Sequence, residues 1–280
     1  MRNDVLIDAE WVRVAPDKVV VATAERVWLH RLDSIEADTP FAQTTVKAGS
    51  ISRTRKLLDG AIASAKGAVS SSIKPPALTP VQWLWRLAGS YHLTHSYPPL
   101  LEEAARRFEK MGRKNFSQWA AQKAREERGH DRLALLDIQS MGYKAEAVVA
   151  ALIPPYAIAL VNYLTQSVRA PDPIACVGYS YAMERLATGV QEKHIQMVEA
   201  LLPSGIHATR CLRVHSSVGD DLEHVEETIK MIVELTPDER VRVATACYET
   251  ALLQFNSSKE DYISDEELEC VLRPLALYKN

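Results

Sequence analysis

Glu127 and His130 stand three residues apart in a stretch of the chain that has helical spacing. Side chains three residues apart project from the same side of a helix, so this carboxylate and this imidazole can reach one metal ion. The stripe around them is apolar at its ends and charged in its middle, and it comprises Phe116, Ala120, Lys123, Glu127, His130, Ala134, Asp137 and Met141. Because charges inside a protein are costly unless they are paired or bind a metal, the stripe indicates a metal site. The alternative is a chance Glu-x-x-His on a solvated face, with His130 as an ordinary core histidine.

A second carboxylate, Glu184, lies in another predicted helix. Its neighbours one turn away are Ser180, Tyr181, Ala187 and Thr188, which predicts that this side of the helix faces the interior. Glu184 is therefore either a metal ligand or one half of a buried ion pair, with Arg185 or Arg213 as the partner.

Asp221 and His224 repeat the three-residue spacing on a further predicted helix. His215 precedes His224 by nine residues, which in a regular helix places it on the opposite side. It can join the other two only if the helix breaks or bulges near Gly219, as helices do at some functional sites. Otherwise His215 supports the ligands or caps the helix.

Three predicted helices thus each offer an inward carboxylate, and two of the three couple it to a histidine. Such ligand sets bind two iron or two manganese ions in helical bundles. Structural zinc is not expected, because no thiolates are spaced to bind it. The four cysteines lie far apart without a C-x-x-C pair, as expected of reduced thiols: Cys176, Cys211, Cys247 and Cys270.

An aromatic segment from Trp83 to Tyr97 contains two further histidines, His92 and His95. Core packing is the simpler interpretation of both. If the segment lines a substrate pocket instead, Tyr91, His95 and Tyr181 are the candidates for its wall.

The elements that position these residues are expected to be helices, because only 11 of the 280 residues are glycine and helix-favouring stretches dominate. Capping sequences at Thr79, Thr236 and Ser264 mark three helix starts. The spacing predicts helices over residues 80–96, 98–112, 115–141, 144–168 with a break at Pro154-Pro155, 173–202, 207–235, 237–260 and 265–276.

Residues 1–75 are expected to form an N-terminal helical arm, with helical spacing over 17–33 and 51–69. The stretch 70–76 is polar and then proline-stiffened, and is the expected linker. It would join the arm to a helical bundle at 76–280, the whole forming one compact domain.

The charges of the chain nearly balance, with 33 Lys and Arg against 36 Asp and Glu, and both signs are interleaved. No face is built for a polyanion, so nucleic acid is not an expected partner. The chain shows neither a signal peptide nor an apolar run of about 18 residues, the usual minimum for a membrane span. We therefore expect a soluble, cytoplasmic protein that does not bind membranes.

These motifs together resemble the heme-oxygenase-like di-metal oxidases and oxygenases, which are relatives of the TenA and PqqC proteins. The resemblance covers residues 80–235 and rests on four segments: Tyr91-His92-Leu93-Thr94-His95 with Pro98-Pro99-Leu100-Leu101, Glu126-Glu127-Arg128-Gly129-His130-Asp131, Gly178-Tyr179-Ser180-Tyr181-Ala182-Met183-Glu184, and His215 with Asp221 and His224. The gaps of 54 residues from His130 to Glu184 and of 31 residues from Glu184 to His215 are similar to those of the family.

The resemblance implies an all-helical, heme-oxygenase-like bundle that binds two Fe(II) ions, or manganese, through Glu127, His130, Glu184, His215, Asp221 and His224. The chain departs from the family pattern in two places. His215 stands six residues before Asp221 instead of four, where Ser217 lies, and Lys123 occupies the place of a further glutamate. Both departures bear on whether the second metal is held.

The resemblance further implies that O2 is a co-substrate and that the substrate is a small organic molecule of specialised metabolism, amino-acid-like or fatty-acid-like. Glu127 and Glu184 would be the catalytic carboxylates, and the N-terminal arm is compatible with a homodimer. Two other classes stay open: a metal-free enzyme like TenA or PqqC, and a non-enzymatic helical binding protein whose buried charges form a structural network.

Overall fold

The computed structural model describes residues 9–32, 50–69, 77–216, 221–255 and 262–277, and only the backbone over 221–224. They divide into two compact units, each assembled from separate stretches of the chain. The first unit comprises Met1–Ser70, Ile174–Leu186 and Glu223–Phe255, and the second comprises Ser71–Pro173, Ala187–Leu222 and Asn256–Asn280. This division does not follow the expected boundary at residue 75, because two long segments from the C-terminal half group with the N-terminal residues. The expected linker at 70–76 lies outside the described residues.

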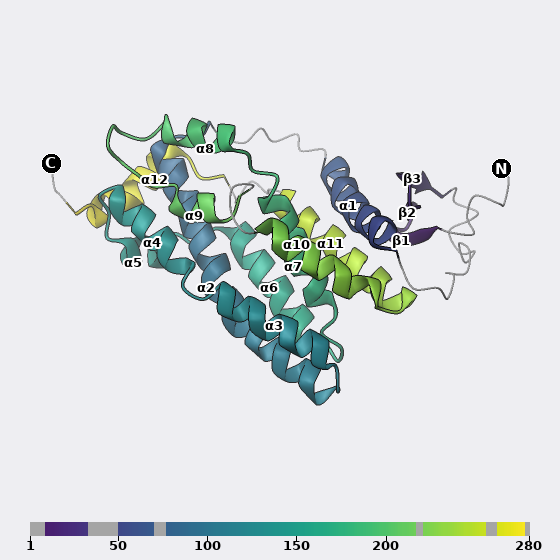
Figure 1. Cartoon of the computed structure of the whole chain (residues 1–280). Coiled ribbons are helices and arrows are strands. Elements are labelled where there is room, and N and C mark those ends of the chain that lie inside the picture. The colour runs from purple at the N-terminus through teal and green to yellow at the C-terminus, as the bar shows by residue number, and fades with distance from the viewer. Residues whose placement is uncertain (1–8, 33–49, 70–76, 217–220, 256–261, 278–280) are drawn as a thin grey trace. The chain divides into compact units, whose positions relative to one another are not determined.

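The second unit is built around one long helix, α2 (Pro80–Lys110), which packs against α3, α4 and α6 (Figure 1). Its other described elements are α3 (Lys114–Glu126), α4 (Asp131–Ser140), α5 (Ala145–Ala151), α6 (Pro155–Arg169), α8 (Glu192–Glu199), α9 (Arg210–Val214), α12 (Asp265–Leu272) and the 3-10 helix η3 (Arg273–Leu275). Trp83, Leu84 and Leu87 from α2 lie at the centre of a core completed by α4, α5, α8 and α12. Apolar residues at helical spacing thus decide which faces meet.

The predicted boundary between residues 96 and 98 is wrong, because α2 runs through Pro98 and Pro99 without ending. A proline inside a helix removes one hydrogen bond and costs about 3 kcal/mol. Leu100, Leu101 and Phe108 beyond the prolines are buried against neighbouring helices, and their burial offsets that cost.

Other predicted boundaries are confirmed. The break at Pro154-Pro155 separates α5 from α6. The Thr79 hydroxyl accepts a hydrogen bond from the N–H of Gln82, and Ser264 forms a complete capping box with Glu267. Thr236 and Glu239 bond reciprocally in the same way. Local sequence therefore controls where these helices begin.

The first unit contains a small β-sheet that the sequence interpretation missed. Strands β1 (Glu10–Ala15), β2 (Lys18–Ala22) and β3 (Val27–Arg31) form an antiparallel sheet in the order β1-β2-β3. The helix expected over 17–33 is therefore wrong for the described residues 17–32, since Val19, Val20 and Val21 favour a strand and Pro16-Asp17 forms a turn. The helix expected over 51–69 is confirmed as α1.

The helices of the first unit are α1 (Ile51–Ala68), α7 (Ala175–Ala187), α10 (Asp221–Val233) and α11 (Pro237–Phe255). Helix α1 packs between α11 and the sheet (Figure 1). A buried ion cluster also joins these elements: Glu10 Oε1 lies 2.7 Å from Nη2 of Arg240 and 3.6 Å from Nε of Arg53. Truncating one member of such a cluster leaves buried charge uncompensated, so the cluster ties the strand to the two helices.

No single helix in the described segments is long and apolar enough to cross a membrane. By length and composition, only the bent pair Ala145–Ala151 and Pro155–Arg169, at 81°, passes the same test together.

Candidate metal site

The sequence predicted one continuous helix over 115–141, but Glu127 and His130 do not share a helix. Helix α3 ends at Glu126 with Glu127 as its C-cap, and α4 begins at Asp131 with His130 as its N-cap. Between them Gly129 has a φ of 94°, a left-handed conformation that residues other than glycine adopt at a cost. The turn keeps both side chains on the same side of the chain.

Three side chains of the second unit converge at this turn. His130 Nδ1 lies 2.8 Å from Glu127 Oε2, and His215 Nε2 lies 3.8 Å from the same oxygen. The two imidazole rings meet edge to face, with centroids 4.8 Å apart. One potential ligand atom from each residue lies within 4.8 Å of the others. We call Glu127, His130 and His215 the ligand trio.

His215 reaches the trio because its helix ends early. The continuous helix predicted over 207–235 is wrong: α9 stops at Val214, and His215 is its C-cap with a φ of −96° and a ψ of 53°. Helix α9 therefore ends before His215, whereas whether the chain breaks near Gly219, so that His215 can join Asp221 and His224, stays a prediction. The residues nearest Gly219 lie outside the described part of the chain.

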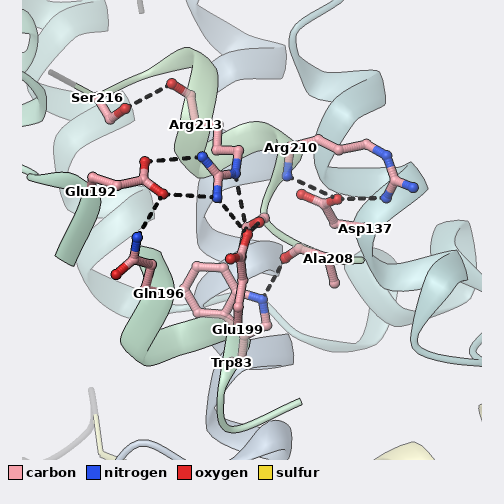
Figure 2. Close-up of polar contacts among 10 residues, drawn as sticks. Trp83, Asp137, Glu192, Gln196, Glu199, Ala208, Arg210, Arg213 and Ser216 are labelled. Atoms are coloured by element: carbon pink, nitrogen blue, oxygen red, sulfur yellow. Dashed lines mark hydrogen bonds and ion pairs between the residues drawn. The ribbon is translucent and has the colours of Figure 1, made fainter. Parts of the chain in front are cut away.

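Two arginines fix the position of α9, as Figure 2 shows. Arg213 binds Glu192 through Nη1 at 3.0 Å and Glu199 through Nη2 at 2.9 Å, both from α8. Arg210 donates from Nη1 to Asp137 of α4 at 2.9 Å, and the N–H of Arg210 also donates to Asp137. Helix α4 begins directly after His130, and α9 ends directly before His215. The contacts of Asp137 with α9 therefore link the positions of the two histidines.

The buried stripe inferred from the sequence survives the helix break. Lys123, Glu127 and Asp137 are all buried, with exposed fractions of 1%, 8% and 0%. Asp137 was part of that stripe, but its contacts with the N-terminus of α9 were not foreseen. The position of Asp137 on a predicted buried stripe signalled that it needs a partner. The sequence could not identify that partner, because Arg210 is 73 residues further along the chain.

Glu127 carries a negative charge at neutral pH. Burial raises the pKa of its carboxyl, but the hydrogen bond from His130 and the charges of His215 and Lys123 outweigh burial, so the pKa lies below its ordinary value of 4.5. Lys123 lies close by, with its Nζ 3.7 Å from Glu126 Oε2. An anionic oxygen with two imidazoles next to it supplies donor groups that a divalent cation can bind when the imidazoles are neutral.

The chemistry of the donors fits some metals better than others. One carboxylate and two imidazoles form the ligand set typical of non-heme Fe(II) oxygenases, and they also suit manganese or catalytic zinc. Cys211 lies near the trio, but burial and the negative charges of Asp137 and Glu127 raise the pKa of its thiol to about 12. A protonated thiol is a poor ligand, so nitrogen and oxygen define this site.

The other predicted ligands, Glu184, Asp221 and His224, are not members of the ligand trio. Glu184 lies on α7 in the first unit, where it is buried with an exposed fraction of 8%. The two arginines proposed as its ion-pair partners bind other carboxylates, Arg185 with Asp59 and Arg213 as above. Asp221 and His224 begin α10, and their side chains lie outside the described part. Ligation by these three, like ligation by the trio, stays a prediction.

Each of the three residues predicted to line a substrate pocket contacts a specific side chain. Tyr91 and His95 stack with ring centroids 5.1 Å apart, and His95 Nδ1 lies 2.8 Å from Oδ2 of Asp131, the residue that follows His130. Tyr181 is fully buried in the first unit and donates from its hydroxyl to Asp59 at 2.8 Å. The roles of all three in a pocket stay predictions.

The solved structures that are similar to this chain include the following two. A domain of unknown function with a heme oxygenase-like fold from Shewanella denitrificans OS217 has a TM-score of 0.56 at 20% identity, over 78% of this chain and 86% of that chain. A TenA homolog from Pseudomonas syringae pv. tomato str. DC3000 has a TM-score of 0.49 at 15% identity, over 76% of this chain and 96% of that chain. No protein-family model and no curated protein matches the sequence.

The helical part of the chain therefore has a heme oxygenase-like fold, as the sequence predicted. At this identity the likeness concerns the fold alone, and a fold hosts many functions. The argument for function must come from the site.

Proposed function

We propose that the protein is a non-heme di-iron oxidase or oxygenase that uses O2 to oxidise a small organic substrate. The observation that supports this proposal is the ligand trio, in which a buried carboxylate and two imidazoles converge from the ends of three helices, α3, α4 and α9. In the proposal the trio holds one ion, and Glu184, Asp221 and His224 contribute the ligands of the second. Bound iron would supply the electrons that O2 requires.

In this proposal the residues of the chain hold the ion and exclude water from the site. Glu127 is ionised and so neutralises one positive charge without first losing a proton. The Nδ1 atom of His130 has Glu127 as its hydrogen-bond partner. A carboxylate that holds the second nitrogen of a metal-bound imidazole fixes its tautomer and orientation, and this arrangement is common around metals. Glu127 can therefore act as a ligand or as the orienting group for His130.

Metal titration of the purified protein tests the proposal. Fe(II) is added without oxygen, or Mn(II) in air, and bound metal is counted after gel filtration. We expect two ions per chain in the wild type and a loss of at least one in His130→Ala and His215→Ala. His95→Ala is the matched control, because His95 is an exposed histidine bonded to Asp131. This variant should bind as much metal as the wild type does.

Variants of the second ligand group separate one metal from two. In Glu184→Gln and His224→Ala we expect one ion to remain bound and O2 consumption by the ferrous protein to fall to the level of free iron. Equal metal content in the wild type and in Glu184→Gln would contradict the di-iron proposal and leave a single-ion site.

A metal-free enzyme on the same fold is the second candidate, and one observation favours it. Lys123 places a buried cation beside Glu126 and lowers the pKa of Glu127, so the negative charge has a protein partner without any ion. If the wild type binds neither iron nor manganese, this candidate replaces the first. A non-enzymatic binding protein whose buried charges form a structural network is the remaining alternative.

A further inference from the structure

The first unit contains an open groove of about 330 Å³ between α1 and the outer half of the sheet. Strands β2 and β3 contribute Lys18, Val20, Leu29 and Arg31, and α1 contributes Ala63 and Gly67. This volume lies at the lower end of the range for small-molecule sites. The groove is separate from the ligand trio, which belongs to the second unit.

Small residues on α1 are the reason that the groove exists. At Gly60 the helix approaches the sheet closely, since a Cβ there would lie 2.4 Å from Cγ2 of Val27. Two turns later a Cβ at Gly67 would meet no atom within 4 Å. The helix therefore packs tightly at one end and leaves open space over the sheet at the other.

The charges in the groove are all of one sign. Lys18 and Arg31 are directly opposite each other in the antiparallel pair of β2 and β3, on the same face as Val20 and Leu29. Like charges in opposite positions destabilise a sheet. Within the described segments no carboxylate lines the groove or pairs with either cation. An anion bound between the two would remove this repulsion.

The apolar floor and the two cations together define a ligand. We propose that the groove binds a small amphipathic carboxylate, with its apolar body over Val20, Leu29 and Ala63 and its carboxylate between Lys18 and Arg31. A planar guanidinium accepts a carboxylate in a bidentate arrangement, which favours this anion. The proposal does not depend on metal binding and assigns the first unit a ligand-binding role of its own.

Calorimetric titration with decanoate tests the proposal in the full-length protein. We expect a Kd below about 1 mM for decanoate. Decanol and decylamine have the same chain without the negative charge, and should bind at least tenfold more weakly. Equal binding of decanoate and decanol would overturn the proposal, because the paired cations would then contribute nothing.

Three variants locate the site. Lys18→Gln and Arg31→Gln should each weaken decanoate binding about tenfold, and Gly67→Leu should abolish it by filling the groove. Leucine is a better helix former than glycine, so Gly67→Leu should also unfold at no lower temperature than the wild type. Wild-type affinity in Gly67→Leu would contradict the proposal, since decanoate would then bind elsewhere.

Two controls complete the design. Lys66→Gln removes a cation from the same helix, where its ammonium lies 5.9 Å from the ring centroid of Phe255, and should leave the decanoate Kd unchanged. Glu127→Gln removes the metal-site carboxylate and should also bind decanoate as the wild type does. A parallel loss of decanoate affinity in Glu127→Gln would show that decanoate occupies the proposed metal site instead.

Discussion

His130 Nδ1 lies 2.8 Å from Glu127 Oε2, although one helix ends beside Glu127 and the next begins after His130. The three-residue spacing thus brings the two side chains together through a turn and not through a helical face. The turn depends on the left-handed conformation of Gly129, and the third member of the trio depends on the early end of α9.

Gly129→Ala should weaken both the fold and the metal site. An alanine in the left-handed region costs about 1–2 kcal/mol, and relief of that strain would shift Glu127 relative to His130. We expect the free energy of unfolding to fall by this amount and Mn(II) affinity to fall about tenfold. Gly112→Ala is the matched control, because Gly112 has a φ of 75° at the end of α2 and is not part of the trio. Its stability loss should be similar and its metal affinity unchanged.

Lys123→Met should strengthen metal binding. The Lys123 ammonium is buried and acts electrostatically on Glu127, so it repels a divalent cation that approaches the same carboxylate. A tenfold change in Kd corresponds to about 1.4 kcal/mol. A buried unit charge a few ångströms from the ion contributes at least about this much, so we expect about a tenfold lower Kd for Mn(II). Lys114→Met, which changes an exposed lysine at the start of α3, should have no effect. A weaker site in Lys123→Met would mean instead that the lysine holds Glu127 in place.

Glu199 should make the position of α9 sensitive to acid. Hydrogen bonds from Thr209 and Arg213 lower the pKa of its carboxyl below the ordinary value of 4.5. The unfolded chain therefore binds this proton more readily than the folded chain does, so the stabilisation is complete above the ordinary pKa. It is lost as the pH falls through the folded-state pKa.

Urea unfolding from about pH 7 down to about pH 3 measures this contribution. The difference in free energy of unfolding between the wild type and Glu199→Gln should be constant above about pH 5 and should shrink toward the acid end. Glu109→Gln removes an exposed carboxylate on α2 and serves as the control. A difference that does not change with pH would exclude an ionic role for Glu199.

Gly178→Ala should be strongly destabilising in the first unit. A Cβ at this position of α7 would lie 2.3 Å from the backbone oxygen of Val243 and 2.8 Å from Cβ of Ala246 on α11. Backbone cannot move aside without displacing the helix, so we expect a loss of about 3 kcal/mol or more in the free energy of unfolding. Gly67→Ala places the same methyl group in open space and should stabilise the protein by up to about 1 kcal/mol. Similar stabilities for the two variants would contradict the close packing of α7 on α11.

Some features of this protein follow from the sequence by itself. Helix starts at Thr79, Thr236 and Ser264 were predictable because the capping hydrogen bonds form between residues within one turn of each other. The burial of the stripe through Lys123, Glu127 and Asp137 was predictable as well, since helical spacing places apolar neighbours on the same side.

Tertiary structure alone decided the rest, because it depends on contacts between residues far apart in the chain. Helix α2 continues through Pro98 because the burial of residues beyond it outweighs the local cost, and residues 10–31 form a sheet whose strands are covered by α1. His215 meets Glu127 only because Arg213 and Asp137 hold a short α9 against α8 and α4. Spacing along a chain identifies groups that can share a helix face, whereas long-range packing determines where each helix stops and which groups meet.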